Sequence, residues 1–98
     1  MIRNRSALIL TLALMALSHA TCHAQETATA VARTAGFTGG FIVHLGCGDG
    51  QLTTEFGRLP RCQVQGLDRS TENVANARQH AHDAGLYGTV VVDRISGN

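Results

Sequence analysis

The residues with the clearest capacity for chemistry are three glycines at alternate positions, Gly46, Gly48 and Gly50, in the stretch HLGCGDG. They follow the apolar run Phe41–Leu45 and precede a stretch of helical character. Glycine lets the backbone turn sharply and lets a ligand approach the main chain, with a helix N-terminus behind it. The pattern therefore predicts a nucleoside- or phosphate-binding loop. The alternative is an ordinary strand-to-helix turn that needs small residues.

An acidic residue follows at the spacing that such a loop requires. Asp68 ends a second apolar run, Val64–Leu67, and an acid about 20 positions after the loop accepts hydrogen bonds from ribose hydroxyls in nucleotide-binding folds. Taken alone, Asp68 could equally interact with the dipole of the helix that follows it. The glycine loop, its strand and Asp68 together favour a cofactor site.

The glycine spacing separates two classes of cofactor. The dinucleotide fingerprint G-x-G-x-x-G needs a last glycine at position 51 or 53, and the sequence has Gln51 and Thr53 there. A dinucleotide-dependent oxidoreductase is therefore the disfavoured class.

The elements that must position this loop alternate between strand and helix. This order predicts an α/β fold, a partial Rossmann-like parallel sheet of three strands (β-α-β-α-β) with right-handed crossovers. Such crossovers leave one face of the sheet and the edge of the first strand uncovered. The expected elements are strand Phe41–Leu45, helix Gln51–Leu59, strand Val64–Leu67, helix Ser70–Ala84 (capped by Ser70 and Gly85) and strand Thr89–Val92.

These residues resemble the class I S-adenosylmethionine-dependent methyltransferases. An apolar strand that runs into LGCGxG is similar to that family's first motif, and GLDRSTENVANARQHAHDAGL resembles its second strand and helix. The resemblance covers residues 39–98 and implies the N-terminal half of a methyltransferase domain that binds S-adenosylmethionine. By that likeness, the methionine and ribose portion is lined by Gly46, Cys47, Gly48 and Gly50, Asp68 holds the ribose diol, and Arg69 frames the adenine edge.

The chain departs from the family pattern at one position and leaves another open. The family usually has an acid where this chain has His44, and a neutral imidazole brings no negative charge to the cofactor's amino-acid end. Asp93 and Ser96 are both candidates for the residue near the adenine amine.

No catalytic residue is predicted, because the methyl acceptor and any general base come from later segments of such a fold. We expect the isolated chain to be marginally stable and inactive. A truncated product, a longer reading frame or a partner chain would then account for the missing C-terminal half, and the acceptor substrate stays open.

The N-terminus has the pattern of a secretory signal peptide. Arg3 and Arg5 precede the uncharged apolar run Ala7–Leu17, which small residues follow. The run is too short for a membrane-spanning helix, so only transient membrane contact through the signal is expected. Cleavage after Ala20 or after Ala24 is predicted.

The resulting organisation is a signal-peptide helix over residues 1–24, a linker or loosely held first helix over 25–38, and the methyltransferase-like domain over 39–98. Export predicts a periplasmic or secreted protein, or a cytoplasmic one where the signal is not used. A lipoprotein with a lipid on Cys22 is the weaker alternative, because His19 stands where a lipobox has an aliphatic residue.

Export conflicts with a cofactor that is made and kept in the cytosol. Together with His44 it supports an alternative function, a non-catalytic exported nucleoside-binding or docking module derived from the same fold. Signal-bearing modules of this type are similar to the N-terminal part of some exported bacterial multidomain proteins.

Three further expectations concern charge, metals and thiols. A formal net charge of +1 indicates no preference for nucleic acid. His80 and His82 lie two positions apart on a helix and therefore on different faces, so no metal site is predicted. Cys47 and Cys62 are expected to be free thiols, because they flank opposite ends of neighbouring parallel strands.

Overall fold

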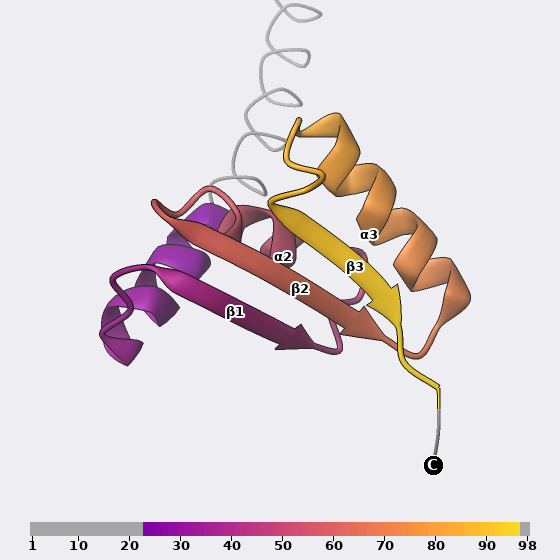
Figure 1. Cartoon of the computed structure of the whole chain (residues 1–98), viewed down its shortest axis with the longest axis horizontal. Coiled ribbons are helices and arrows are strands. Elements are labelled where there is room, and N and C mark those ends of the chain that lie inside the picture. Colours follow the sequence, from indigo (N-terminus) through magenta and orange to yellow (C-terminus); the bar gives the residue numbers. More distant parts are fainter. Residues whose placement is uncertain (1–22, 97–98) are drawn as a thin grey trace, which may run out of the picture.

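The computed structural model describes residues 23–96, and its three parallel strands form one sheet in the order β1-β2-β3 (Figure 1). The pairing register runs from Gly40 opposite Cys62 in the first strand pair and from Val64 opposite Val90 in the second. The predicted α/β fold is confirmed. After a first helix over residues 23–35 come β1 (Gly40–Leu45), α2 (Gln51–Phe56), β2 (Cys62–Asp68), α3 (Thr71–Asp83) and β3 (Val90–Arg94).

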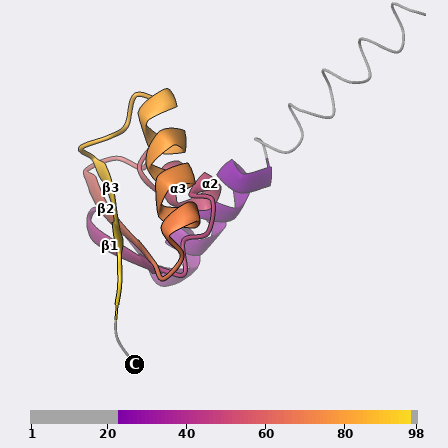
Figure 2. The same ribbon diagram turned by 90° about the vertical axis from the view of Figure 1, so that its right-hand side faces the viewer.

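The helices all lie on one face of the sheet, as the edge-on view of Figure 2 shows. The right-handed crossovers of a parallel sheet produce this arrangement when the strands are added in one direction. The core lies between the sheet and α3, where small side chains on the helix let its backbone approach the strands closely. Its fully buried members include Val64, Val90 and Val92 from the strands and Ala77 and Ala81 from the helix.

Both predicted ends of α3 are observed. The N–H of Asn73 donates to the Ser70 hydroxyl oxygen over 3.2 Å, which satisfies one of the free donors of the first helical turn. At the other end Gly85 has a φ of 72°, the left-handed conformation that commonly ends a helix.

Two expected elements differ from those observed. The segment over 25–38 is helical as far as residue 35, so the alternative of a first helix describes it and the linker does not. Ala28 and Ala32 on this helix are buried, which explains its order. Helix α2 ends at Phe56 rather than Leu59, because Gly57, Arg58 and Leu59 bond to the third residue before them and tighten the chain into turns.

The opposite face of the sheet is uncovered among the described residues. Phe41, Val43 and Leu45 of β1 are 62%, 51% and 69% exposed on that side. Helices in the described part of the chain are too short or too polar to cross a membrane. Residues 1–22, which hold most of the expected signal peptide, lie outside the described residues.

Candidate functional site

The glycine loop is fastened to the carboxyl end of β2. The N–H groups of Gly46 and Cys47 both donate to the Leu67 carbonyl, over 2.7 and 3.1 Å. The N–H of Gly50 closes the loop by donating to the Cys47 carbonyl over 3.1 Å. All three predicted glycines have positive φ values, 70°, 58° and 82° in chain order. Residues other than glycine rarely adopt this backbone conformation, which explains why glycine occurs at these three positions.

The three glycines serve two different purposes. A Cβ atom at Gly46 or Gly48 would meet nothing within 4 Å, so the backbone there borders open space that a ligand could occupy. A Cβ atom at Gly50 would instead lie 2.6 Å from the Cα and Cβ of Ala77. Gly50 is therefore required for the approach of α2 to α3. Of the three, Gly46 and Gly48 are the candidates for contact with a cofactor.

Asp68 is joined directly to this loop. Its Oδ2 accepts a hydrogen bond from the N–H of Gly48 over 3.0 Å, and its Oδ1 accepts from the N–H of Ser70 over 2.9 Å. The Asn73 side-chain amide donates to the same Oδ1 over 3.3 Å. These bonds, led by those from Ser70 and Gly48, lower the pKa of the Asp68 carboxyl below its usual value. The site thus holds an ionised, oriented carboxylate beside the open backbone of the loop.

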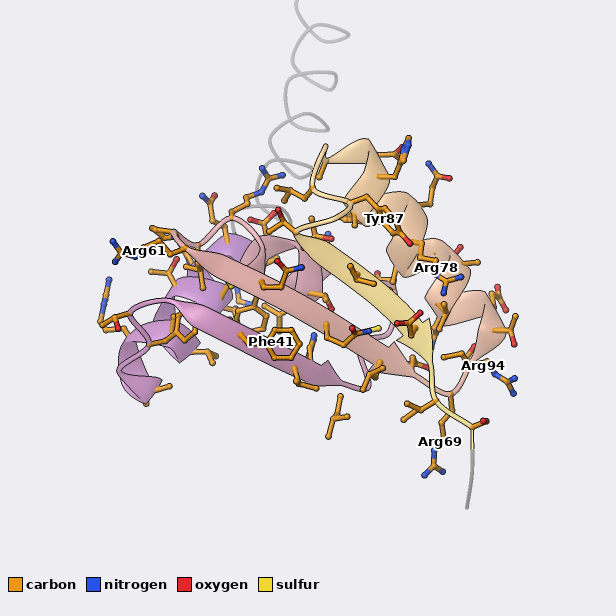
Figure 3. All side chains as sticks on the ribbon, viewed as in Figure 1. Phe41, Arg61, Arg69, Arg78, Tyr87 and Arg94 are labelled. Atoms are coloured by element: carbon orange, nitrogen blue, oxygen red, sulfur yellow. The ribbon has the colours of Figure 1, made fainter. Side chains whose placement is uncertain are left out.

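Two residues that the sequence analysis missed support this arrangement. Asn73 lies one helical turn after the cap, and a search for polar groups in the first turn of α3 would have found it. Arg94 donates from Nε to the Arg69 carbonyl over 3.0 Å and so fixes the connection after Asp68. The side chain of Arg69 itself is exposed and points into solvent beyond the end of β3 (Figure 3).

His44 lies beneath the loop, on the helix side of β1. Its Nδ1 is 2.7 Å from the hydroxyl oxygen of Thr53, and its ring meets the edge of Phe56 with centroids 5.7 Å apart. Burial lowers the pKa of His44, so the ring is neutral at pH 7. The side chain of His44 therefore links β1 to α2 and brings no negative charge to the loop.

Cys47 is buried at the turn of the loop, where a small side chain fits. A Cβ atom at Gly66 would lie 3.0 Å from Cγ2 of Thr53 and 3.4 Å from the Sγ of Cys47, so Gly66 lets Thr53 and Cys47 pack closely against β2. Burial, and then the charge of Asp68, raise the pKa of the Cys47 thiol. Cys47 and Cys62 are both free thiols, as predicted.

The structure separates the two candidates for the adenine end. The carboxylate of Asp93 accepts from Gln65 over 2.9 Å and from Arg78 over 3.2 Å, on and around the edge of β3. The N–H of Ile95 donates to the Asp68 carbonyl over 3.0 Å, so the chain after β3 runs past the site. Ser96, the next residue, is exposed, whereas the carboxylate of Asp93 is already hydrogen-bonded to Gln65 and Arg78.

The first helix lies beside the glycine loop, a placement that no sequence signal indicated. A hollow of about 270 Å³ separates it from the loop and the start of α2, and its lining includes Thr27, Cys47, Asp49 and Leu52. Within residues 23–96, no three His, Cys, Asp or Glu side chains gather as a metal site would require.

Comparison with known proteins identifies the family. Residues 42–97 match the family model described as a methyltransferase domain. The chain belongs to this family. The resemblance of the chain to the N-terminal half of the class I S-adenosylmethionine-dependent methyltransferases is thereby confirmed, together with the Rossmann-like fold. No curated protein matches the chain in sequence.

Solved structures of the same fold include two named as methyltransferases and one named as a cyclase. An S-adenosyl-L-methionine-dependent methyltransferase candidate from Methanococcus maripaludis is 21% identical, with a TM-score of 0.68 over 74% of this chain and 33% of its own length. The [4+2]-cyclase SpnF is 27% identical, with a TM-score of 0.65 over 74% of this chain and 27% of its own. Coclaurine N-methyltransferase, bound to N-methylheliamine and SAH, is 20% identical, with a TM-score of 0.64 over 72% and 21% of the two chains. The chain thus spans a third or less of the length of these proteins.

Proposed function

We propose that the chain is the cofactor-binding half of an S-adenosylmethionine-dependent methyltransferase. The observation that carries the proposal is the ionised carboxylate of Asp68, held by the N–H of Gly48 at 3.0 Å, 20 residues apart in sequence. This contact supports the proposal, because it holds a carboxylate beside the glycine loop, and a carboxylate is the group that accepts hydrogen bonds from ribose hydroxyls in nucleotide-binding folds. Membership of the methyltransferase domain family and the cofactor product SAH in coclaurine N-methyltransferase both support this cofactor.

The described residues account for binding and orientation of such a cofactor. Asp68 would accept hydrogen bonds from the ribose diol, the open backbone at Gly46 and Gly48 would border the methionine portion, and Ser96 would lie near the adenine. When bound, the cofactor supplies an electrophilic methyl group on a sulfonium. The protein contributes mainly by holding donor and acceptor in line, which removes much of the entropic cost of the encounter. The acceptor and its binding residues are outside what this half provides.

Calorimetric titration with S-adenosylhomocysteine tests the proposal. We expect saturable binding with one site per chain, and no heat with NAD, because the loop lacks the third glycine of the dinucleotide fingerprint. Adenosine alone is the control for recognition of the nucleoside without the amino-acid end. Binding of NAD in place of S-adenosylhomocysteine would contradict the proposal.

The second candidate is a non-catalytic or differently catalytic module on the same fold. His44 favours this second candidate. The family usually has an acid at this position, whose charge would hold the cofactor's amino group, whereas His44 is neutral and is hydrogen-bonded to Thr53. SpnF has the same fold and is named as a [4+2]-cyclase, so the fold by itself does not imply methyl transfer. In the titration above, the absence of any heat with S-adenosylhomocysteine would favour this candidate.

We also propose that the N-terminal segment directs export, which is supported by its basic start and its short apolar run. Cleavage after Ala20 would leave the first helix whole. Cleavage after Ala24 would remove the His23 carbonyl, which accepts the Thr27 hydroxyl over 2.9 Å. We therefore expect the intact mass of the exported chain to correspond to a start at Thr21. Recovery of the protein only in the cytoplasm, with Met1 retained, would contradict export.

A further inference from the structure

The carboxylate of Asp68 has few free acceptor positions. An ionised carboxylate offers about four lone-pair positions, two on each oxygen. Its Oδ1 accepts from the N–H of Ser70 over 2.9 Å and from the side-chain amide of Asn73 over 3.3 Å, so both positions on this oxygen are taken. Its Oδ2 accepts from the N–H of Gly48 over 3.0 Å and keeps one position. In this arrangement Asp68 can accept one hydroxyl group, whereas a ribose diol offers two.

The three donors differ in how easily they can leave the carboxylate. The N–H of Gly48 belongs to the backbone of the loop, which is itself bonded to the carbonyl of Leu67. The N–H of Ser70 is also a backbone group, in the turn that caps α3. The amide of Asn73 is at the end of a side chain with rotatable bonds, and its contact is the longest of the three. Asn73 is only half-buried, so water can bond to its amide once it has left Asp68.

We propose that Asn73 sets the ribose specificity of this site, because its amide competes with one ribose hydroxyl for Oδ1 of Asp68. The inference rests on the proposed function and goes beyond it, since it concerns which hydroxyl groups of the ligand contribute to affinity. One hydroxyl donates to the free position on Oδ2. The other reaches Oδ1 only when the amide of Asn73 leaves, so the hydrogen bond that the ligand gains is offset by the one that Asn73 loses.

This competition predicts unequal contributions from the two hydroxyl groups. A ligand without the hydroxyl directed to Oδ2 loses a hydrogen bond to a charged group, and no protein donor replaces it. A ligand without the hydroxyl directed to Oδ1 leaves Asn73 in place, so that oxygen stays fully bonded and little affinity is lost. The site should therefore bind one monodeoxyribose form of its ligand nearly as well as the ribose form.

A purely supporting role for Asn73 predicts the opposite effect on affinity. If the amide only oriented the carboxylate of Asp68, its removal would loosen the carboxylate and weaken the binding of every ribose ligand. If the amide competes with the ligand, its removal frees Oδ1 and strengthens binding. The direction of the change in affinity therefore separates the two roles.

Calorimetric titration of the full chain with S-adenosylhomocysteine and with its 2′-deoxy and 3′-deoxy analogues tests the inference. For the parent chain we expect one analogue to bind within about threefold of S-adenosylhomocysteine, and the other to bind about tenfold or more weakly. For Asn73→Ala we expect S-adenosylhomocysteine to bind about 2- to 10-fold more tightly than to the parent chain. Both analogues should then bind to this variant about tenfold or more weakly than S-adenosylhomocysteine, because both oxygens have a free position.

Asn76→Ala is the matched control. Asn76 is an exposed residue in the following turn of α3, and it is not among the donors to Asp68 in the described part of the chain. We expect this variant to keep all three affinities within about twofold of the parent values. Circular dichroism checks that both variants fold, which is expected because the cap at Ser70 uses the backbone N–H of Asn73.

The outcomes distinguish this inference from the proposed function. Weaker or unchanged binding of S-adenosylhomocysteine to Asn73→Ala overturns the inference, and so do equal losses for the two deoxy analogues in the parent chain. In these cases saturable binding of S-adenosylhomocysteine to the parent chain still supports the proposed function. Absence of binding to the parent chain overturns the proposed function and the inference with it.

Discussion

Replacing Gly50 by alanine is expected to destabilise the domain by about 2–4 kcal/mol, as the sum of backbone strain and overpacking. The φ of Gly50 is 82°, and an added Cβ would lie 2.6 Å from the Cα of Ala77. The backbone cannot easily withdraw. The Gly50 carbonyl accepts from both the N–H and the hydroxyl of Thr54, over 2.9 and 2.7 Å, and its N–H donates to Cys47.

Urea unfolding followed by circular dichroism measures this effect. Gly46→Ala is the matched control, because Gly46 lies in the same loop with a φ of 70° and open space around its Cβ position. Gly46→Ala should lower the free energy of unfolding only by the contribution of backbone strain, about 1–2 kcal/mol. Gly50→Ala should therefore unfold at a clearly lower urea concentration than Gly46→Ala, and both at a lower concentration than the parent chain. Equal losses in the two variants would mean that the contact with Ala77 does not limit the loop.

Asp68→Asn is expected to weaken binding of S-adenosylhomocysteine about 10- to 100-fold, which is the range for loss of a hydrogen bond to a charged group. The amide keeps the size of the side chain and loses the charge that would accept the ribose hydroxyls. It would also present an NH₂ group to the donors of Gly48 or Ser70, whose bonds to Asp68 measure 3.0 and 2.9 Å. Calorimetric titration measures the change in affinity.

Asp49→Asn is the matched control for this experiment. Asp49 is an exposed carboxylate in the same loop that accepts only from the N–H of Gln51, over 3.1 Å. We expect Asp49→Asn to change the affinity for S-adenosylhomocysteine less than threefold. Both variants remove one negative charge near the loop, so a general electrostatic effect on binding would be the same in both. A comparable loss of affinity in the two variants would show that Asp68 has no specific role.

The pH dependence of Asp68 has a definite sign. Hydrogen bonds from Ser70 and Gly48 lower its pKa in the folded chain. The stabilisation that they provide is therefore complete above the pKa of the unfolded chain, about 3.9, and is lost as the pH falls through the lower folded value. We expect the difference in melting temperature between the parent chain and Asp68→Asn to be constant from pH 8 to pH 5. A difference that disappears within that range would contradict the assignment.

Local patterns were sufficient to predict much of the fold. Alternating apolar runs indicated the strands, Ser70 and Gly85 indicated the ends of α3, and the spacing of Gly46, Gly48 and Gly50 indicated a sharp loop. Each of these features depends on neighbouring residues along the chain, through hydrogen-bonding propensity or the φ that a residue can adopt. The position of Asp68 at a strand end is equally local, so the two halves of the site were visible before the structure.

Distances between elements could not be read from such patterns. Contact with Ala77 makes Gly50 a packing glycine, and a Cβ atom at Gly57, just after α2, would likewise clash with Val90. The link from Asp68 to Gly48 and the burial of His44 against Thr53 likewise join residues on different elements.

The amino-acid sequence by itself thus determined the class of fold, the glycine loop and its acid, because propensity and periodicity are local properties. Tertiary structure decided which glycines border open space, that the first helix lies beside the loop, and that the apolar surface is concentrated on the edge of β1. Those properties arise from the packing of elements against one another, and no single segment contains them.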